Sequence, residues 1–358
     1  MTTLPQSIWW DRIGRSLRYV AAISSRFQEE KSFLLDASVG IPWEDIFQER
    51  VRQHVLRLYS DRMMRVHEPG EENPGKYCLT KCCPKSFQNG YWPDRSYAKY
   101  LCGNPDLTFH KCFFWIKCPA DEGVQDQWED FILEYEQEAK AAALPIRAVF
   151  LLETLLFPEE VFHDLPILRY GVSTGDCRVF AMELIEELSQ NDPDVADYSD
   201  YLTELTVQVG QNHPEICSVL LADPQVFLRN PLRIGEQAWM SGFHIGRSSK
   251  ESDIFRLVWK AQLVWLFPLL EQERLAFVMN YARVLKNYLP LAGAGETRIE
   301  DPEDLEFGTL YYLTHKHHLI FSEREQRLLD LGRNARNLLA HNNPLSFEEI
   351  GELMEIMK

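Results

Sequence analysis

The sequence predicts an α/β N-terminal lobe built on a parallel sheet, over residues 1–172, and an all-α C-terminal lobe, over residues 173–358. Three observations support this prediction. Short apolar runs alternate with helical patterns in the first half of the chain, as they do in strand-helix-strand units. From about residue 174 the strand-like runs give way to helical spacing. A chain of 358 residues is also longer than a single core usually supports, which favours two domains.

In the N-terminal lobe, local spacing and breaker residues define each expected element. Apolar residues from Trp9 to Ile23 recur at helical spacing, and the short apolar run LLDAS is followed by a turn at Gly40-Ile41-Pro42. The segment 66–106 is rich in Gly, Pro, Asn and Cys, which predicts loops and one short helix near 96–101. The expected order is a helix (9–31), a strand (31–38), a helix (43–59), a strand (111–118), a helix (125–143) and a strand from residue 146.

In the C-terminal lobe, long segments have apolar residues at helical spacing. They include DCRVFAMELIEEL and the run from Ser252 to Leu289. A loop rich in Gly and Pro, from 289 to 306, precedes the last two expected helices. The sequence contains no internal repeat and no low-complexity segment.

The charge balance limits the classes of partner. Lys and Arg total 37 against 54 Asp and Glu, for a formal net charge of -17, which argues against sequence-independent binding to nucleic acid. The N-terminus has no signal-peptide pattern, and no apolar stretch is long enough to cross a bilayer. We therefore expect a cytoplasmic protein without membrane contact, in which the eight cysteines stay reduced.

The turn after the first strand does not have the composition of a phosphate-binding loop. Such a loop needs several glycines, so that backbone N–H groups approach the phosphates, and a Lys that reaches the outer ones. The segment VGIPW has one glycine, no Lys, and a Pro that removes a donor. A second glycine segment, Gly242 to Ser249, is one residue short, has Arg247 in place of Lys and follows no strand. We therefore expect no nucleotide cofactor.

Several segments together resemble a known family. The Trp-rich opening helix, the LLDAS, FFWIK and AVFLLE strands, and the later runs VWKAQLVWLFPLLEQER, LEFGTLYYL and ARNLLAHNNPLSFEEI resemble the inactive STAND-type P-loop proteins of bacterial conflict systems. The resemblance covers most of the chain. It implies a degenerate P-loop-like sheet, eroded hydrolytic residues, and an adaptor or sensor role in antiphage defence, with other protein subunits as partners.

Arg336, Asn337 and His341 match the R-N-x-x-x-H pattern of HEPN-type ribonucleases. On a helix, Asn337 and His341 stack one turn apart on the polar side, with Arg336 beside them. His341 has the right type to transfer a proton near neutral pH, and Arg336 to stabilise charge on phosphorus. The alternative function is therefore a metal-independent ribonuclease. In that family two such helices face each other across a homodimer, and only under this alternative would RNA be a partner.

A structural role for the same residues remains open. Side chains near the end of a helix can bind its last carbonyls, and a histidine there interacts favourably with the helix dipole. Asn342-Asn343-Pro344 would then stop the helix, and Ser346 with Glu349 would form a capping box for the next one.

Cysteines and tryptophans are the remaining candidates. Cys78, Cys82, Cys102 and Cys112 are weak candidate zinc ligands, because their spacings differ from the usual C-x-x-C turns and core packing is the competing interpretation. The sequence HKHH from His315 is expected to be a solvated helix end or loop. Large aromatic side chains dominate interface energies, so some tryptophans are candidate partner contacts, although core packing is expected for most of them. These candidates are Trp9, Trp10, Trp92 and Trp239.

Overall fold

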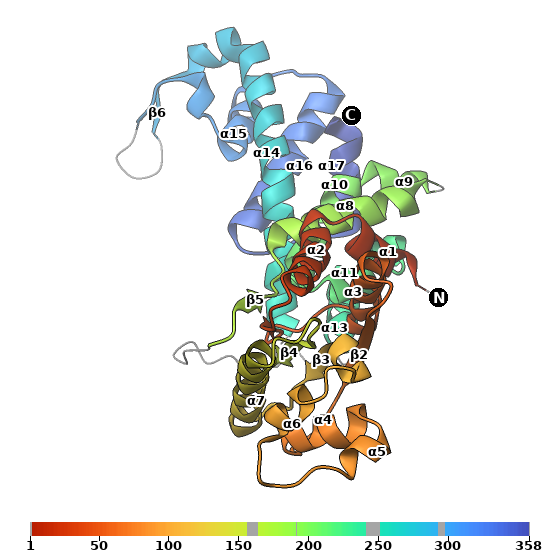
Figure 1. The fold of residues 1–358 in the computed structure, drawn as a ribbon. Helices are drawn as coiled ribbons and strands as arrows, with labels where there is room; N and C mark the ends of the chain where they lie inside the picture. The colour runs from red at the N-terminus through yellow and green to blue at the C-terminus, as the bar shows by residue number, and fades with distance from the viewer. Residues whose placement is uncertain (1, 156–163, 191, 241–250, 293–297, 358) are drawn as a thin grey trace. The chain divides into compact units, whose positions relative to one another are not determined.

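The computed structural model describes residues 2–155, 164–190, 192–240, 251–292 and 298–357 (Figure 1). The chain divides into two compact units, Met1–Ser173 and Thr174–Lys358. The helices and strands of the first unit are α1 (Leu4–Asp11), α2 (Gly14–Gln28), β1 (Phe33–Asp36), α3 (Glu44–Leu58), β2 (Met63–His67), α4 (Pro74–Cys82), α5 (Lys85–Gln88), α6 (Tyr97–Cys102), β3 (Cys112–Lys117), α7 (Glu122–Ala141), β4 (Val149–Thr154) and β5 (Ile167–Arg169).

The first unit contains a five-stranded parallel sheet with the strand order β2-β3-β4-β1-β5. This confirms the predicted parallel sheet of the N-terminal lobe. Strand β1 lies between β4 and β5, so that Leu34 is opposite Leu152 on one side and Ile167 on the other. The central strands are buried along their length, as continuous apolar runs predict for a sheet covered on both faces.

Alternate residues of the strands pack against different sets of helices. On one face, Phe113 of β3 contacts Phe27 of α2, with ring centroids 4.7 Å apart, and Trp115 contacts Phe47 of α3. On the other face, Phe114 stacks on Phe150 of β4 at 5.2 Å. That second face is covered by buried residues of α4, α6 and α7. The alternation follows from the two-residue period of a strand.

Two predictions for the first unit are wrong in detail. The expected helix 9–31 is two helices, because Ile13 has an extended backbone and caps α2 after α1 has ended at Asp11. The segment 66–106, expected to be loops with one short helix near 96–101, does contain that helix as α6, but it also contains α4 and α5, and its first two residues belong to β2. Asn73 and Ser96 cap α4 and α6 by accepting the backbone N–H groups of Lys76 and Lys99.

The second unit is mainly helical, and the prediction of an all-α lobe needs one correction. Two short strands pair antiparallel there, with Leu291 opposite Ile299. Its elements are α8 (Thr174–Ser189), α9 (Pro193–Asp197), α10 (Ser199–Gly210), α11 (Pro214–Leu220), α12 (Pro224–Arg229), α13 (Pro231–Met240), α14 (Glu251–Leu285), β6 (Leu291–Ala292), β7 (Arg298–Ile299), α15 (Phe307–His317), α16 (Glu323–Ala340) and α17 (Phe347–Met357).

One buried hydroxyl joins three elements of the first unit. The Tyr135 hydroxyl accepts the backbone N–H of Ala148 at 3.0 Å and bonds His110 Nδ1 at 2.8 Å, while His110 Nε2 lies 3.0 Å from the carbonyl oxygen of Asn104. Burial lowers the pKa of His110, which favours the neutral ring in this chain of hydrogen bonds.

We predict that Tyr135→Phe lowers the free energy of unfolding of the full chain by about 1–3 kcal/mol, because it leaves a buried N–H and a buried imidazole nitrogen without their partner. Urea unfolding followed by circular dichroism measures the effect. Tyr91→Phe is the matched control, since the Tyr91 hydroxyl bonds the exposed Arg95 carbonyl. Equal stability of the two variants would contradict the prediction.

Candidate functional site

The carboxyl ends of the parallel strands bring polar residues together at one edge of the sheet. Asp36 ends β1, Lys117 ends β3 and Glu153 lies one residue before the end of β4. Backbone hydrogen bonds fix these ends: the N–H of Ala37 donates to the carbonyl of Thr154, and the N–H of Cys118 to that of Glu153, both at 2.9 Å. Open parallel sheets bind ligands at this edge, so it is the first place to look for a site.

The loop from β1 to α3 does not form a phosphate cradle. Gly40 adopts a left-handed φ of 77° in a tight turn, and its N–H donates to the carbonyl of Ala37 at 2.8 Å. The first turn of α3 carries Glu44 and Asp45, whose negative charges oppose a phosphate at the helix N-terminus. Glu44 also forms an ion pair with Lys117, and Glu68 lies 3.6 Å from the same ammonium group.

Lys117, the last residue of β3, is held by the carboxylates of Glu44 and Glu68. Burial by itself would lower the pKa of Lys117, but the hydrogen bond from Lys117 to Glu44 and the charges of Glu44, Glu153 and Glu68 together raise it. Its charge is therefore largely neutralised inside the protein.

Glu153 is a buried carboxyl group at the same edge, with 6% of its surface exposed. Trp115 Nε1 donates to one of its oxygens at 2.5 Å. Burial raises the pKa of Glu153 from 4.5 to about 7, Glu44 adds to the rise, and Trp115 and Lys117 oppose it. Such a group changes its protonation state near neutral pH.

We predict that the unfolding free energy falls as the pH rises from about 4.5 to about 7, by about 3 kcal/mol from this group. Because the pKa of Glu153 is raised, the folded state binds the proton more tightly than the unfolded state does. The resulting contribution to stability is complete below pH 4.5 and is lost above about pH 7. Glu153→Gln keeps an acceptor for Trp115 and should flatten the profile. Urea titrations near pH 5 and near pH 8 compare the two proteins; a profile unchanged by the substitution would be inconsistent with this assignment.

The second glycine segment, Gly242 to Ser249 with Arg247, lies outside the described residues. The expectation that this segment binds no nucleotide therefore stays a prediction.

The Arg336-Asn337-His341 motif lies at the end of α16, which starts with a capping box between Ser322 and Glu325. Asn337 and His341 are exposed, and the backbone N–H of His341 donates to the carbonyl of Asn337 at 3.1 Å. Arg336 forms an ion pair with Glu306, the residue before α15. The charge of Arg336 is therefore paired with the Glu306 carboxylate. The catalytic role of the motif stays a prediction.

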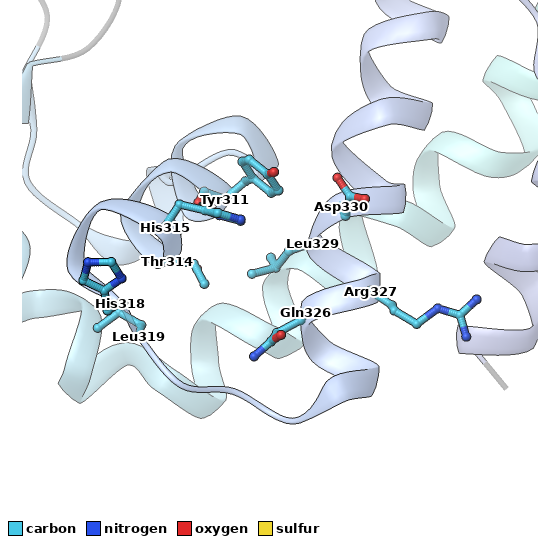
Figure 2. A pocket seen from close by; sticks show the side chains of 9 residues that line it. All are labelled: Tyr311, Thr314, His315, His318, Leu319, Gln326, Arg327, Leu329 and Asp330. Atoms are coloured by element: carbon cyan, nitrogen blue, oxygen red, sulfur yellow. Dashed lines mark hydrogen bonds between the residues drawn. The ribbon is translucent and has the colours of Figure 1, made fainter.

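A cavity of about 520 Å³ lies farther along the same helix pair, between α15 and α16 (Figure 2). Tyr311 and His315 line it from α15, with ring centroids 4.0 Å apart, and Leu329 and Asp330 line it from α16. Figure 2 shows Arg327 extending away from the α15 side chains. None of Arg336, Asn337 and His341 is among the residues that line this cavity.

The HKHH segment ends α15, and its residues from His315 to His318 are exposed, which confirms the expected solvated helix end. His318 has a left-handed φ of 51° and terminates the helix.

The four candidate zinc ligands are all buried but do not converge on one point. Cys78 and Cys82 are neighbours on α4. Cys102 Sγ points to the carbonyl of Tyr135, and Cys112 Sγ to that of Thr108. Within the part of the chain that the structure describes, no three His, Cys, Asp or Glu side chains are grouped so that they could hold a metal ion.

Sequence reasoning missed a cysteine-histidine pair. Cys82 Sγ lies 3.8 Å from His67 Nε2, and His67 Nδ1 lies 3.1 Å from the Tyr77 hydroxyl. His67 ends β2, a strand hidden in a segment that was expected to be irregular. The apolar run MMRV before it, after the turn-forming Ser60 and Asp61, is the signal that would have indicated a strand.

The tryptophan candidates divide into core and surface residues. Trp9 and Trp10 are buried, and Trp10 Nε1 donates to the carbonyl of Pro42, so both belong to the core. Trp239 is partly buried and donates to the carbonyl of Val209. Trp92 is 71% exposed.

Among the described residues, no helix combines the length and the apolar character that crossing a bilayer requires. No protein-family model matches this chain, and no curated protein is similar to it in sequence.

Proposed function

We propose that this chain is a non-hydrolysing adaptor or sensor subunit of a bacterial antiphage defence system, acting through contacts with other proteins in the cytoplasm. The observation that carries the proposal is the Glu44–Lys117 ion pair at the N-terminus of α3. In a degenerate P-loop-like sheet, this is the position at which a helix N-terminus would receive phosphate. Here Glu44 places a carboxylate in that position, and Asp45 adds a second one.

The lack of a phosphate cradle in the loop from β1 to α3 supports an adaptor over a nucleotide-driven motor. Helices cover both faces of the sheet, so it would support surfaces for binding other proteins and would not catalyse a reaction. Function would then depend on exposed groups that another subunit can bury.

We predict that neither Mg-ATP nor Mg-GTP binds the full chain at millimolar concentration in isothermal titration. Phosphate binding at the α3 N-terminus would have to overcome two like charges in its first turn. Saturable, magnesium-dependent binding of either nucleotide would remove the basis of the proposal.

The connection between α15 and α16 is the candidate contact for a partner subunit. Ile320 is 92% exposed there, and the neighbouring Leu319 lines the cavity between the two helices. An apolar side chain beside a cavity of this size is typical of a position that a partner covers, since burial of such a group stabilises the complex.

We predict that Ile320→Asp weakens, by at least tenfold, the complex formed when the chain is co-expressed with the products of neighbouring genes, because burying the new charge costs more than 1.4 kcal/mol. Met182→Asp is the matched control, since Met182 is 55% exposed on α8, away from this connection in the sequence. Affinity purification and titration calorimetry measure the effect. If both variants bind as the wild type does, the connection is not the contact.

The ribonuclease alternative is tested with the same proteins. Labelled RNA is incubated with the wild type and with His341→Ala, each with and without the co-expressed subunits. The adaptor proposal expects intact RNA in every reaction. Cleavage by the wild type that disappears in His341→Ala would replace the adaptor with the ribonuclease.

A further inference from the structure

The first unit contains a cluster of sulfur and imidazole groups that the proposed adaptor function does not use. It lies where α4 packs beside the end of β2, and its centre is Cys82, the last residue of α4. His67 approaches the Cys82 sulfur through Nε2, and Tyr77 holds the other ring nitrogen of His67. A histidine fixed at both nitrogens beside a thiol is the arrangement that activates a cysteine as a nucleophile.

Further groups around Cys82 favour its thiolate. Cys78, one helical turn earlier on α4, and the positive charge of Arg65 on β2 both lower the pKa of Cys82. Hydrogen bonding from Cys78 lowers the pKa of Cys82 from 9.0 to about 5, against its burial, and His67 contributes to the shift. The other nearby sulfurs, Cys83 and Cys112, are held as thiols, because burial raises their pKa values to about 12 and about 11.

We propose that Cys82 is a peroxide-reactive cysteine whose sulfur, positioned by His67, Tyr77 and Cys78, is oxidised to a sulfenic acid by hydrogen peroxide. Only 6% of the Cys82 surface is exposed, which favours a reagent as small as a peroxide. This inference is independent of the adaptor proposal, because its test measures the reactivity of Cys82 and needs no partner protein.

The chemistry balances with the groups present. The Cys82 thiolate attacks one oxygen of the peroxide, an S–O bond forms and the O–O bond breaks. The leaving hydroxide takes up the proton that the Cys82 thiol gave to His67 Nε2 and departs as water, while His67 Nδ1 keeps its contact with the Tyr77 oxygen. Cys82 loses two electrons and the peroxide gains them.

The test uses the purified, reduced full chain. It is treated with hydrogen peroxide in the presence of dimedone, which traps sulfenic acids, and its peptides are examined by mass spectrometry. We expect the adduct at Cys82 to exceed that at any other cysteine by about tenfold or more, since the thiolate is the reactive form. His67→Gln should slow adduct formation about tenfold, whereas Cys83→Ser, the matched control beside it, should not change the rate at Cys82.

A second measurement, the pH dependence of alkylation, uses only the wild-type chain and so needs no variant that might disturb the fold. Alkylation of Cys82 by iodoacetamide should proceed at a nearly constant rate between about pH 6.5 and 8.5, where an ordinary thiol accelerates about 50-fold. The difference in thiolate ultraviolet absorbance between wild type and Cys82→Ser should likewise appear below pH 7, at about pH 5. A Cys82 that forms no more adduct than the other cysteines, or whose alkylation accelerates like an ordinary thiol, would overturn the proposal.

Discussion

The covering of the parallel sheet on both faces is the constraint on which the first unit depends. Parallel strands cannot be joined by tight turns, and the helices that follow β1, β2 and β3 in the chain cover the two faces of the sheet. Successive residues of β3 therefore pack against different helices. Phe113 contacts α2, and Phe114 belongs to the buried cluster formed with α4, α6 and α7. In the buried strands β1, β3 and β4, the apolar runs confine the polar residues to the strand ends.

The composition of those ends determines what the sheet can do. Glu44, Glu68 and Glu153 supply negative charge around Lys117, and Arg169 lies 3.9 Å from Asp36 at the neighbouring strand ends. A phosphate would be repelled here, whereas a proton is retained, as the raised pKa of Glu153 indicates. The edge thus resembles the site of a nucleotide-binding sheet in position and differs from it in charge.

The same geometry brings the Cys82 cluster together. Strand β2 forms the edge of the sheet, so its last residue, His67, has no neighbouring strand on one side and meets the end of α4 instead. In the second unit, the packing of α15 on α16 has a comparable effect on the arginine motif. It pairs Arg336 with Glu306, and it turns residues several positions away, Tyr311 and Leu329, towards a cavity.

The sequence by itself determined the parallel sheet and the mainly helical second half, because apolar periodicity is a local property that survives folding. It also determined that the turn after β1 lacks lysine and successive glycines. It did not predict β2, a short edge strand that is only partly buried and has Arg65 at its centre. It did not predict α4, since the many Gly, Pro and Asn residues of 66–106 concealed a short helix whose stability comes from packing. Tertiary structure alone decided which charges meet. Glu44 and Lys117, Arg336 and Glu306, and His67 and Cys82 are separated in the chain by 15 to 73 positions, and only the packing of their elements places them in contact.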